Sequence, residues 1–424
     1  MRRFAFLAAA LAMASPAHAE IDRAAAARSL AEAADLCGGG KALWKVSLCG
    51  PMLIADPQTR QVVANRAGPG LTRDGEVFAG TLPADIPIAN TAVDWNGTRW
   101  IMVMDGALGG DAFDRAALMM HESWHRAQVR LGFPMLSPDI PYLATTMGRS
   151  MVRLEWRALA TALTAEDETL RLRAIADALA FRQFRRWTET GAESERQLEM
   201  NEGLAEYTGQ RMSGRPDVEA HVAAILARME KGDSFSRSFA YGTGPAYGLL
   251  LDRYAPHWRD RLKASDDLGV LLERALGAKR LGGHVDITAA ETRYGGEAIF
   301  DEEHTLQVTR EQAQATWKAA LVDGPVLRLP FSKMNFSFDP NQVFPMPGLG
   351  TVYPSARISD AWGVLDVGGG GALIDSGFGG VSVAAPQAGT TSGRGWRLEL
   401  APGWRMVAGA RPGDMTVEKA APGP

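Results

Sequence analysis

The sequence predicts an α+β protein with a β-rich N-terminal part, a helical core and a C-terminal β-sandwich. Residues 43–105, and those past about residue 325, contain short apolar runs separated by Gly, Pro and Asn, a pattern typical of strands and turns. Residues 113–280 instead repeat apolar side chains at helical spacing. The chain has 424 residues, which is enough for two or three domains with separate cores.

These changes of pattern set the expected domain bounds. A leader comes first, followed by a helix with an antiparallel β part, a helical part and the β-sandwich. The expected bounds of these four parts are 1–19, 20–110, 111–324 and 325–424. Each of the last three parts is long enough to bury a core of its own.

The leader has the design of a secretory signal peptide. Arg2 and Arg3 precede an apolar run, residues 4–14, and a small-residue triplet ending at Ala19 marks the cleavage site. The run is too short to cross a membrane and no later segment reaches about 18 apolar residues, so we expect no membrane span. We therefore expect a secreted protein, with the periplasm as its compartment.

Charge and composition exclude one class of partner. Hydrophobic residues make up 46% of the chain and charged residues 22%, as in ordinary globular proteins, and the net charge is −4. A nucleic-acid-binding protein would show a basic excess, so we expect no nucleic-acid partner.

The two cysteines, Cys37 and Cys49, are expected to form a disulfide in an oxidising compartment. A loop this short would contribute about 3 kcal/mol in the chain-entropy model. Two buried free thiols are the alternative.

The N-terminal part is expected to begin with an alanine-rich helix over residues 21–36, although residues 20–42 could also be a short propeptide. Four β-type runs follow, namely "WKVSLCGPMLIAD", "RQVVAN", "GEVFAGTLP" and "TAVDWNGTRWIMVM". Asn96 and Gly97 divide the last run and predict a tight hairpin between its two halves. Asn96 also begins the glycosylation pattern Asn-Gly-Thr, but the turn is the preferred interpretation.

The helical part is expected to open with residues 113–131, capped by Asp111 or Asp114. Further helices are expected in "MVRLEWRALATAL", "ETLRLRAIADALAFRQFRRW", "ERQLEMNEGLAEYTGQRM" and "AYGLLLDRYAPHW". The basic run "RQFRR", residues 182–186, is interpreted as a solvated surface or a salt-bridged helix face rather than an anion site.

Strands with Gly and Pro turns fill the C-terminal part, which favours a small β-sandwich. Its "VGGGGALI" segment, residues 367–374, is as glycine-rich as a phosphate-binding loop but lacks a following Lys-Ser/Thr and a helical pattern. We interpret it as a glycine-rich hairpin.

The strongest chemical signal is "HESWH". His121 and His125 lie four residues apart, so on a helix both imidazoles share a face and can reach one cation. Glu122 points about 100° further round the helix, where it can stand beside the cation without binding it. Hydrolytic zinc chemistry uses this arrangement, because the metal lowers the pKa of its water and the carboxylate accepts the proton.

A zinc site of this kind needs a third protein ligand and an open fourth position. Glu202 and Glu206, in "EMNEGLAEYTG", are also four residues apart on an expected helix. One of them can bind the metal while the other holds the outer nitrogen of a histidine ligand. The alternative is an ordinary acidic helix face with two solvated glutamates.

Together, "HESWH" and "NEGLAEY" resemble the gluzincins, zinc peptidases whose ligands are two histidines and a glutamate. The resemblance implies a thermolysin-like helical catalytic core, with zinc held by His121, His125 and Glu202. The Asn-Glu-Gly start is similar to the aminopeptidase and leukotriene-hydrolase branch, in which the glutamate after the asparagine binds zinc. Glu206 matches a position that supports a histidine ligand in the thermolysin branch. Glu122 would be the general base and then the general acid.

The resemblance extends to "SFAYGTGPAYGLLLDRY", residues 238–254. Tyr241, three residues before Gly244 where a helix opens, matches a tyrosine that stabilises the oxyanion in the aminopeptidase branch. Tyr247 is a neighbouring alternative, and Tyr241 could instead be a packed aromatic residue. The strand "TRWIMVM" resembles the gluzincin edge strand, to which an extended peptide adds.

The sequence departs from the aminopeptidase branch in two ways. A long helical insertion separates His125 from Glu202, which follows 77 residues later. The family's Gly-x-Met-Glu-Asn stretch, whose glutamate captures the free amine of the substrate, has no counterpart in the glycine-rich residues 105–111. Cleavage within chains and cleavage at their ends therefore stay equally open.

We therefore expect a secreted zinc metallopeptidase that acts on a peptide or protein substrate. Zinc is the expected cofactor, although cobalt and manganese suit the same donors. One alternative is a catalytically silent, zinc-containing binding protein, which would not need Glu122 as a general base. Another alternative is a zinc-dependent hydrolase of a non-peptide substrate.

Overall fold

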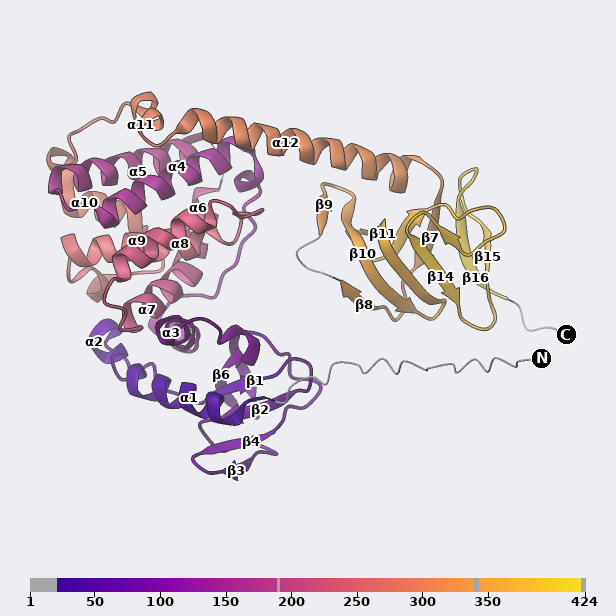
Figure 1. Cartoon of the computed structure of the whole chain (residues 1–424), viewed down its shortest axis with the longest axis horizontal. Coiled ribbons are helices and arrows are strands. Elements are labelled where there is room, and N and C mark those ends of the chain that lie inside the picture. The colour runs from indigo at the N-terminus through magenta and orange to yellow at the C-terminus, as the bar shows by residue number, and fades with distance from the viewer. Residues whose placement is uncertain (1–20, 189–190, 339–342, 421–424) are drawn as a thin grey trace, which may run out of the picture. The chain divides into compact units, whose positions relative to one another are not determined.

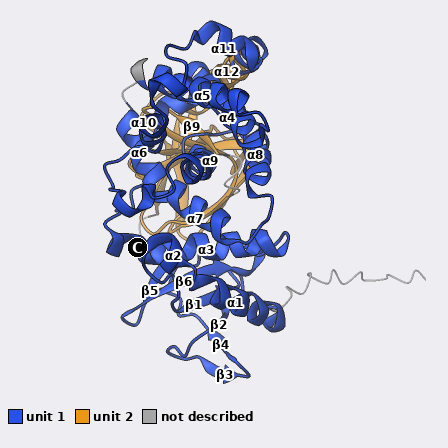
Figure 2. Ribbon diagram, turned by 90° about the vertical axis from the view of Figure 1, so that its left-hand side faces the viewer, with its two compact units in different colours: residues 1–303 blue, residues 304–424 orange. Residues whose placement is uncertain are grey.

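The computed structural model describes residues 21–188, 191–338 and 343–420 (Figure 1). The chain divides into two compact units, residues 1–303 and residues 304–424 (Figure 2). A six-stranded sheet and a helical region make up the first unit, and a ten-stranded sheet belongs to the second. This order of parts confirms the predicted α+β fold class.

The first unit begins with two helices and six strands, α1 (Arg23–Cys37), α2 (Gly40–Trp44), β1 (Met52–Ala55), β2 (Gln61–Ala64), β3 (Thr72–Asp74), β4 (Val77–Thr81), β5 (Thr91–Trp95) and β6 (Thr98–Met104). The strands form one sheet in the order β3-β4-β2-β1-β6-β5. Neighbouring strands are antiparallel except β1 and β6, which run parallel. This pair departs from the expected antiparallel arrangement, because the chain returns beside β1 by a crossover rather than by a direct hairpin.

The Asn96–Gly97 turn forms as predicted. Both residues have a positive φ, 48° and 71°, as a tight two-residue hairpin requires, and Trp95 pairs with Thr98 across the turn. The hairpin places β5 at the outer edge of the sheet and leaves β6 between β5 and β1. The prediction that "TRWIMVM" is an edge strand is therefore wrong, because β6 has a partner on each side and β5 is the outer strand.

The two faces of this sheet are covered differently. Because alternate residues of a strand point to opposite faces, β1 sends Ile54 to one face and Leu53 to the other. The first face packs against α1 and against α3 (Ala112–Gln128). The second face packs in a separate cluster that includes Trp100. The sheet therefore provides a fixed support for α3.

One observation, the disulfide, bears on the compartment in which the protein folds. Cys37, the last residue of α1, forms a disulfide with Cys49 shortly before β1, which confirms the predicted pairing over two free thiols. The bond and the burial of α1 against the sheet make this helix part of the fold. The predicted signal peptide, residues 1–19, lies outside the described residues. No helix in the described part of the chain is long and apolar enough to cross a membrane.

The helical region continues after α3 with α4 (Thr146–Thr164), α5 (Glu168–Thr188), α6 (Ala192–Leu198), α7 (Leu204–Met212), α8 (Val218–Met229), α9 (Phe239–Tyr254), α10 (Leu268–Arg280), α11 (Ile287–Arg293) and α12 (Gly296–Lys318). A π turn, Glu199–Gly203, joins α6 to α7 without a break. Asp111, one of the two predicted caps, closes the start of α3 by accepting a hydrogen bond from the backbone nitrogen of Asp114.

Charged side chains are buried inside this helical region. Arg182 and Arg185 of α5 are 3% and 0% exposed. Arg185 forms ion pairs of 2.7 Å with both Glu155 and Glu195, which are also fully buried. Of the two interpretations of "RQFRR", the salt-bridged helix face is therefore correct for these arginines.

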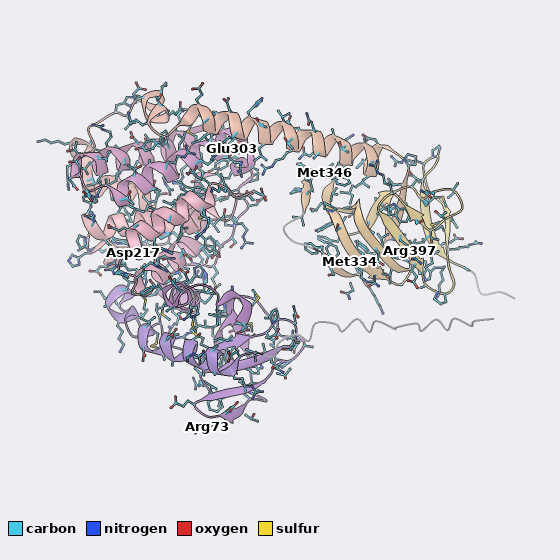
Figure 3. The ribbon with its side chains drawn as sticks, in the orientation of Figure 1. Arg73, Asp217, Glu303, Met334, Met346 and Arg397 are labelled. Carbon is cyan, nitrogen blue, oxygen red and sulfur yellow. A yellow bond between two sulfur atoms is a disulfide. The ribbon has the colours of Figure 1, made fainter. Side chains whose placement is uncertain are left out.

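A second buried ion cluster joins α12 to α4. Glu303, labelled in Figure 3, lies near the start of α12 and is 3% exposed. Its two carboxylate oxygens pair with Arg149 at 2.5 Å and with Arg153 at 2.9 Å. The first turns of α12 are thereby fixed to the helical region.

The second unit contains ten strands, β7 (Val326–Pro330), β8 (Asn335–Phe338), β9 (Phe344–Met346), β10 (Gly350–Asp360), β11 (Gly363–Asp375), β12 (Gly380–Ala384), β13 (Ser392–Gly393), β14 (Trp396–Leu400), β15 (Trp404–Ala408) and β16 (Met415–Lys419). Seven of them follow the order β13-β14-β11-β12-β7-β16-β15, and β10 pairs with β11, β8 and β9. One apolar core receives side chains from β7, β10, β11, β12, β14 and β16. The strands of the predicted C-terminal sandwich are thus joined in a single ten-stranded sheet, and the second unit also contains the C-terminal part of α12.

The "VGGGGALI" segment forms the middle of β11 rather than the predicted hairpin. Gly369 and Gly371 have positive φ values, 88° and 74°, which residues with a side chain adopt only with strain. Before these glycines β11 pairs with β14, and after them it pairs with β12. The glycines therefore allow one long strand to bend and change partners.

We predict that Arg185→Met lowers the free energy of unfolding of the first unit by about 3–5 kcal/mol, because the buried carboxylates Glu155 and Glu195 lose a counter-charge. The matched control is Arg253→Met, which removes an exposed ion pair with Glu219 and should cost at most about 1 kcal/mol. Urea unfolding of both variants beside the native protein measures the difference. Equal destabilisation by the two substitutions would contradict the assignment of a buried ion network.

Candidate metal centre

Helix α3 carries "HESWH" through the interior of the first unit. Met119 and Met120 pack on the sheet, and His121 and His125 share another face because they lie four residues apart. The two histidines are 4% and 6% exposed, and their ring centroids are 4.8 Å apart. The predicted placement of both imidazoles on one helix face is therefore observed.

Glu202 completes a group of three donors. Its Oε2 atom lies 3.5 Å from His121 Nε2 and 3.4 Å from His125 Nε2, and the two Nε2 atoms are 3.1 Å apart. A cation that binds N and O at about 2.0–2.1 Å with tetrahedral angles would separate its ligand atoms by about 3.3 Å. The three atoms therefore fit one face of a coordination tetrahedron. Within the described ranges, this is the one group of His, Cys, Asp or Glu with the spacing of a metal site.

The π turn between α6 and α7 presents Glu202 to the histidines. A π turn inserts an extra residue into the helical repeat, and such turns often mark functional sites. Gly203 lies against Gly244 of α9, since a Cβ added at Gly244 would lie only 2.2 Å from Gly203 Cα. The two glycines allow α9 to approach the π turn closely, so Tyr241, about one helical turn earlier, reaches Glu202.

Two further predicted residues contact the donor group. Glu206 Oε2 lies 2.9 Å from His121 Nδ1, the ring nitrogen that does not face the other donors. The Tyr241 hydroxyl donates a hydrogen bond of 2.6 Å to Glu202 Oε2, and the tyrosine ring stacks on His121. Tyr247, the alternative, donates instead to a buried carboxylate of α4. The structure thus brings Tyr241, and not Tyr247, to the centre.

A relay of two side-chain amides connects His125 to Glu202. His125 Nδ1 lies 2.6 Å from Gln128 Oε1, and Gln128 Nε2 donates to Asn201 Oδ1 at 2.8 Å. Asn201 Nδ2 then donates to Glu202 Oε1 at 3.2 Å. The relay favours the tautomer of His125 that leaves Nε2 free to bind a cation. Sequence reasoning missed both amides, although Gln128 lies three residues after one donor and Asn201 directly before another.

The electrostatics of the centre favour a positive charge between its carboxylates. Burial lowers the pKa of His121, but hydrogen bonds to Glu202 and Glu206 outweigh it and raise the pKa to about 10. Burial raises the pKa of Glu202, but its hydrogen bonds to the two histidines hold the pKa well below its usual range. A proton on His121 thus occupies the role that a metal cation could fill.

Glu122 is the one carboxylate of the centre that is left without full hydrogen bonding. It is 3% exposed, and its Oε2 atom has no hydrogen-bond partner among the described residues. Burial raises the pKa of Glu122 above its usual value. The two histidines oppose this effect, and the charges of Glu202 and Glu206 add to it. Burial of a carboxylate without full hydrogen bonding is costly, and the position of Glu122 beside the donor group gives it a candidate chemical role.

Comparison of the chain with protein-family models, curated proteins and solved structures finds no match. The centre is therefore interpreted from its own geometry. That geometry brings together the six residues singled out in the sequence, His121, Glu122, His125, Glu202, Glu206 and Tyr241.

We predict that Glu202→Gln loses most of the metal affinity of the chain, because it replaces the oxygen donor that faces both Nε2 atoms. Glu206→Gln should weaken affinity by about 10- to 100-fold, because it weakens only the contact to His121 Nδ1. Titration of zinc against a competing chelator measures both, with the exposed Glu166→Gln as a control of native affinity. A larger loss in Glu206→Gln than in Glu202→Gln would contradict the donor assignment.

Proposed function

We propose that this chain is a secreted zinc metallopeptidase of the gluzincin type, which hydrolyses peptide bonds through an activated water. One observation carries the proposal. A single buried centre combines the three donors His121, His125 and Glu202 with a further buried carboxylate, Glu122, that is not among the donors. A structural metal site needs only its ligands, whereas hydrolysis also needs a base.

The donor set suits zinc. Two imidazoles and one carboxylate are a common combination in catalytic zinc sites, and they leave a fourth position open. A bound zinc ion would lower the pKa of a water molecule and polarise the peptide carbonyl. His121 and His125 would bind through Nε2 and Glu202 through Oε2, the atoms that face one another. Glu206 would hold His121 in orientation through Nδ1.

Glu122 would carry the proton of the reaction. Its carboxylate would accept a proton from the attacking water as the new C–O bond forms. It would then give this proton to the amine nitrogen as the peptide C–N bond breaks, so the residue returns to its starting state. The position of Glu122 next to the first donor on α3 supports both steps, because the side chain lies beside the donor group without belonging to it.

Tyr241 would stabilise the negative charge that develops on the carbonyl oxygen. Its hydroxyl is a hydrogen-bond donor that already lies 2.6 Å from Glu202 Oε2. A donor held at this position is suited to the oxyanion of a tetrahedral intermediate. Stacking of the tyrosine ring on His121 restricts its movement.

The organisation of the chain supports an exported enzyme. The disulfide is typical of proteins that fold in an oxidising compartment, and residues 1–19 would direct export to the periplasm. Residues 20–110 and 111–324 would form the catalytic domain, and residues 325–424 a separate β-sandwich. The substrate would be a peptide or a protein.

We predict that the native chain cleaves a mixed peptide library and that Glu122→Gln lowers the rate by about 10²- to 10⁴-fold, because the proton acceptor is lost. Both proteins should hold one zinc ion per chain, since Glu122 is not among the donors. Metal analysis and mass spectrometry of the cleaved library measure the two quantities, with Glu166→Gln as the matched control.

The possible outcomes separate the proposal from its alternatives. Zinc in both proteins with cleavage in neither would contradict a peptidase and favour the silent binding protein or a non-peptide substrate. Zinc in neither protein would contradict the metal centre itself. Equal cleavage by the native chain and Glu122→Gln would contradict the role of Glu122.

A further inference from the structure

The buried charges of α5 extend to the π turn that carries Glu202. Arg182 donates hydrogen bonds through both terminal nitrogens to the carboxylate of Glu199, with Nη1 2.8 Å from Oε1. Glu199 is the first residue of the π turn and is 0% exposed. Arg182 also contacts Asp267, the cap of α10, at 3.0 Å. The π turn is thus tied to two other helices through one guanidinium group.

Burial leaves these groups little freedom. A charge removed from water is costly unless close partners compensate it with good geometry. Glu199 receives such partners from the fork of Arg182, and Arg186 adds a longer ion pair at 3.5 Å. A rotation of the Glu199 side chain would break these contacts without access to water as a replacement. The Glu199 carboxylate is therefore a fixed point in the helical region.

Thr243 of α9 adds a neutral partner to this fixed point. Its hydroxyl, which is fully buried, donates to Glu199 Oε1 at 2.6 Å. Thr243 lies two residues after Tyr241 on the same helix. Three contacts therefore join the π turn to α9, namely Glu199 to Thr243, Gly203 to Gly244 and Glu202 to Tyr241.

We propose that Glu199 and Thr243 form a clamp that positions Glu202 and Tyr241 together at the metal centre. Because Glu199 lies three residues before Glu202 in the same turn, its position sets the direction of the Glu202 carboxylate. Because Thr243 follows Tyr241 by two residues, the same hydrogen bond sets the position of the tyrosine hydroxyl. Both are positioning residues, since they act through Glu202 and Tyr241. The inference rests on the proposed metal centre and is independent of the identity of the substrate.

Substitutions at Thr243 test the clamp without removing a charge. Thr243→Val removes the hydroxyl and keeps a branched side chain, whereas Thr243→Ser keeps the hydroxyl and loses the methyl group. We expect Thr243→Val to weaken zinc binding by about tenfold, the lower end of the range for groups that orient ligands, and Thr243→Ser to restore it. Competition with a chelator measures the affinity. The absorption spectrum of the cobalt-loaded chain reports the coordination geometry, which should change only in Thr243→Val.

A buried threonine outside the clamp provides the matched control. Thr208 of α7 uses its hydroxyl to accept a hydrogen bond from Trp44 at 3.0 Å. Thr208→Val should therefore lower the melting temperature while zinc affinity and the cobalt spectrum stay native. An equal loss of zinc affinity in Thr208→Val and Thr243→Val would overturn the clamp. It would show that removal of any buried threonine hydroxyl weakens zinc binding.

Other outcomes also decide the matter. Native affinity in Thr243→Val would overturn the clamp. Equal losses in Thr243→Val and Thr243→Ser would also overturn it, because the retained hydroxyl of the serine would then have no effect. If Thr243→Val does not fold, Thr243→Ala compared with Thr243→Ser makes the same test of the hydroxyl. A native chain that binds no zinc would overturn the metal centre as well, whereas zinc binding without peptide cleavage would leave the clamp standing.

Discussion

Buried negative charge around two imidazoles is the constraint on which the rest of the structure depends. Glu122 and Glu202 are buried and Glu206 is partly buried, and charges removed from water are costly unless compensated. His121 compensates part of this charge, because hydrogen bonds to Glu202 and Glu206 raise its pKa to about 10. The sheet supports α3 from one side. On the other side Tyr241 of α9 contacts Glu202, and the arginines of α5 contact Glu199 in the π turn that carries Glu202. A divalent cation at the three facing donors would satisfy this arrangement more completely than a proton.

Helical periodicity made much of the site predictable. His121 and His125 had to share a face once residues 113–131 formed a helix, and Glu202 and Glu206 had to lie near each other for the same reason. Strand patterns and the Asn-Gly turn likewise predicted β1, β2, β4 and the β5–β6 hairpin, whereas the short, exposed strand β3 was not predicted. The connection between the two helices came from the resemblance to gluzincins, because periodicity carries no information about which distant helices meet.

The features that the sequence did not predict are tertiary. Strand order places β5 outside β6, and alternation within a strand cannot reveal which neighbours it will have. The "RQFRR" run was ambiguous because its acidic partners come from α4, α6 and the π turn. Glycines in β11 allow a bend or a hairpin equally well, and pairing on both sides decides for the bend. The Gln128–Asn201 relay joins two residues 73 positions apart in the sequence, and their helices meet only in the folded structure.

X-ray absorption at the zinc edge of the native chain, loaded with one equivalent of zinc, tests most directly whether His121, His125 and Glu202 hold a cation. We predict four nitrogen or oxygen ligands at about 2.0 Å, with the scattering pattern of two imidazoles. Loss of the imidazole pattern in a His121→Ala, His125→Ala double variant would assign it to these residues. A six-coordinate shell of oxygens without imidazole scattering in the native chain would contradict the metal centre and the function built upon it.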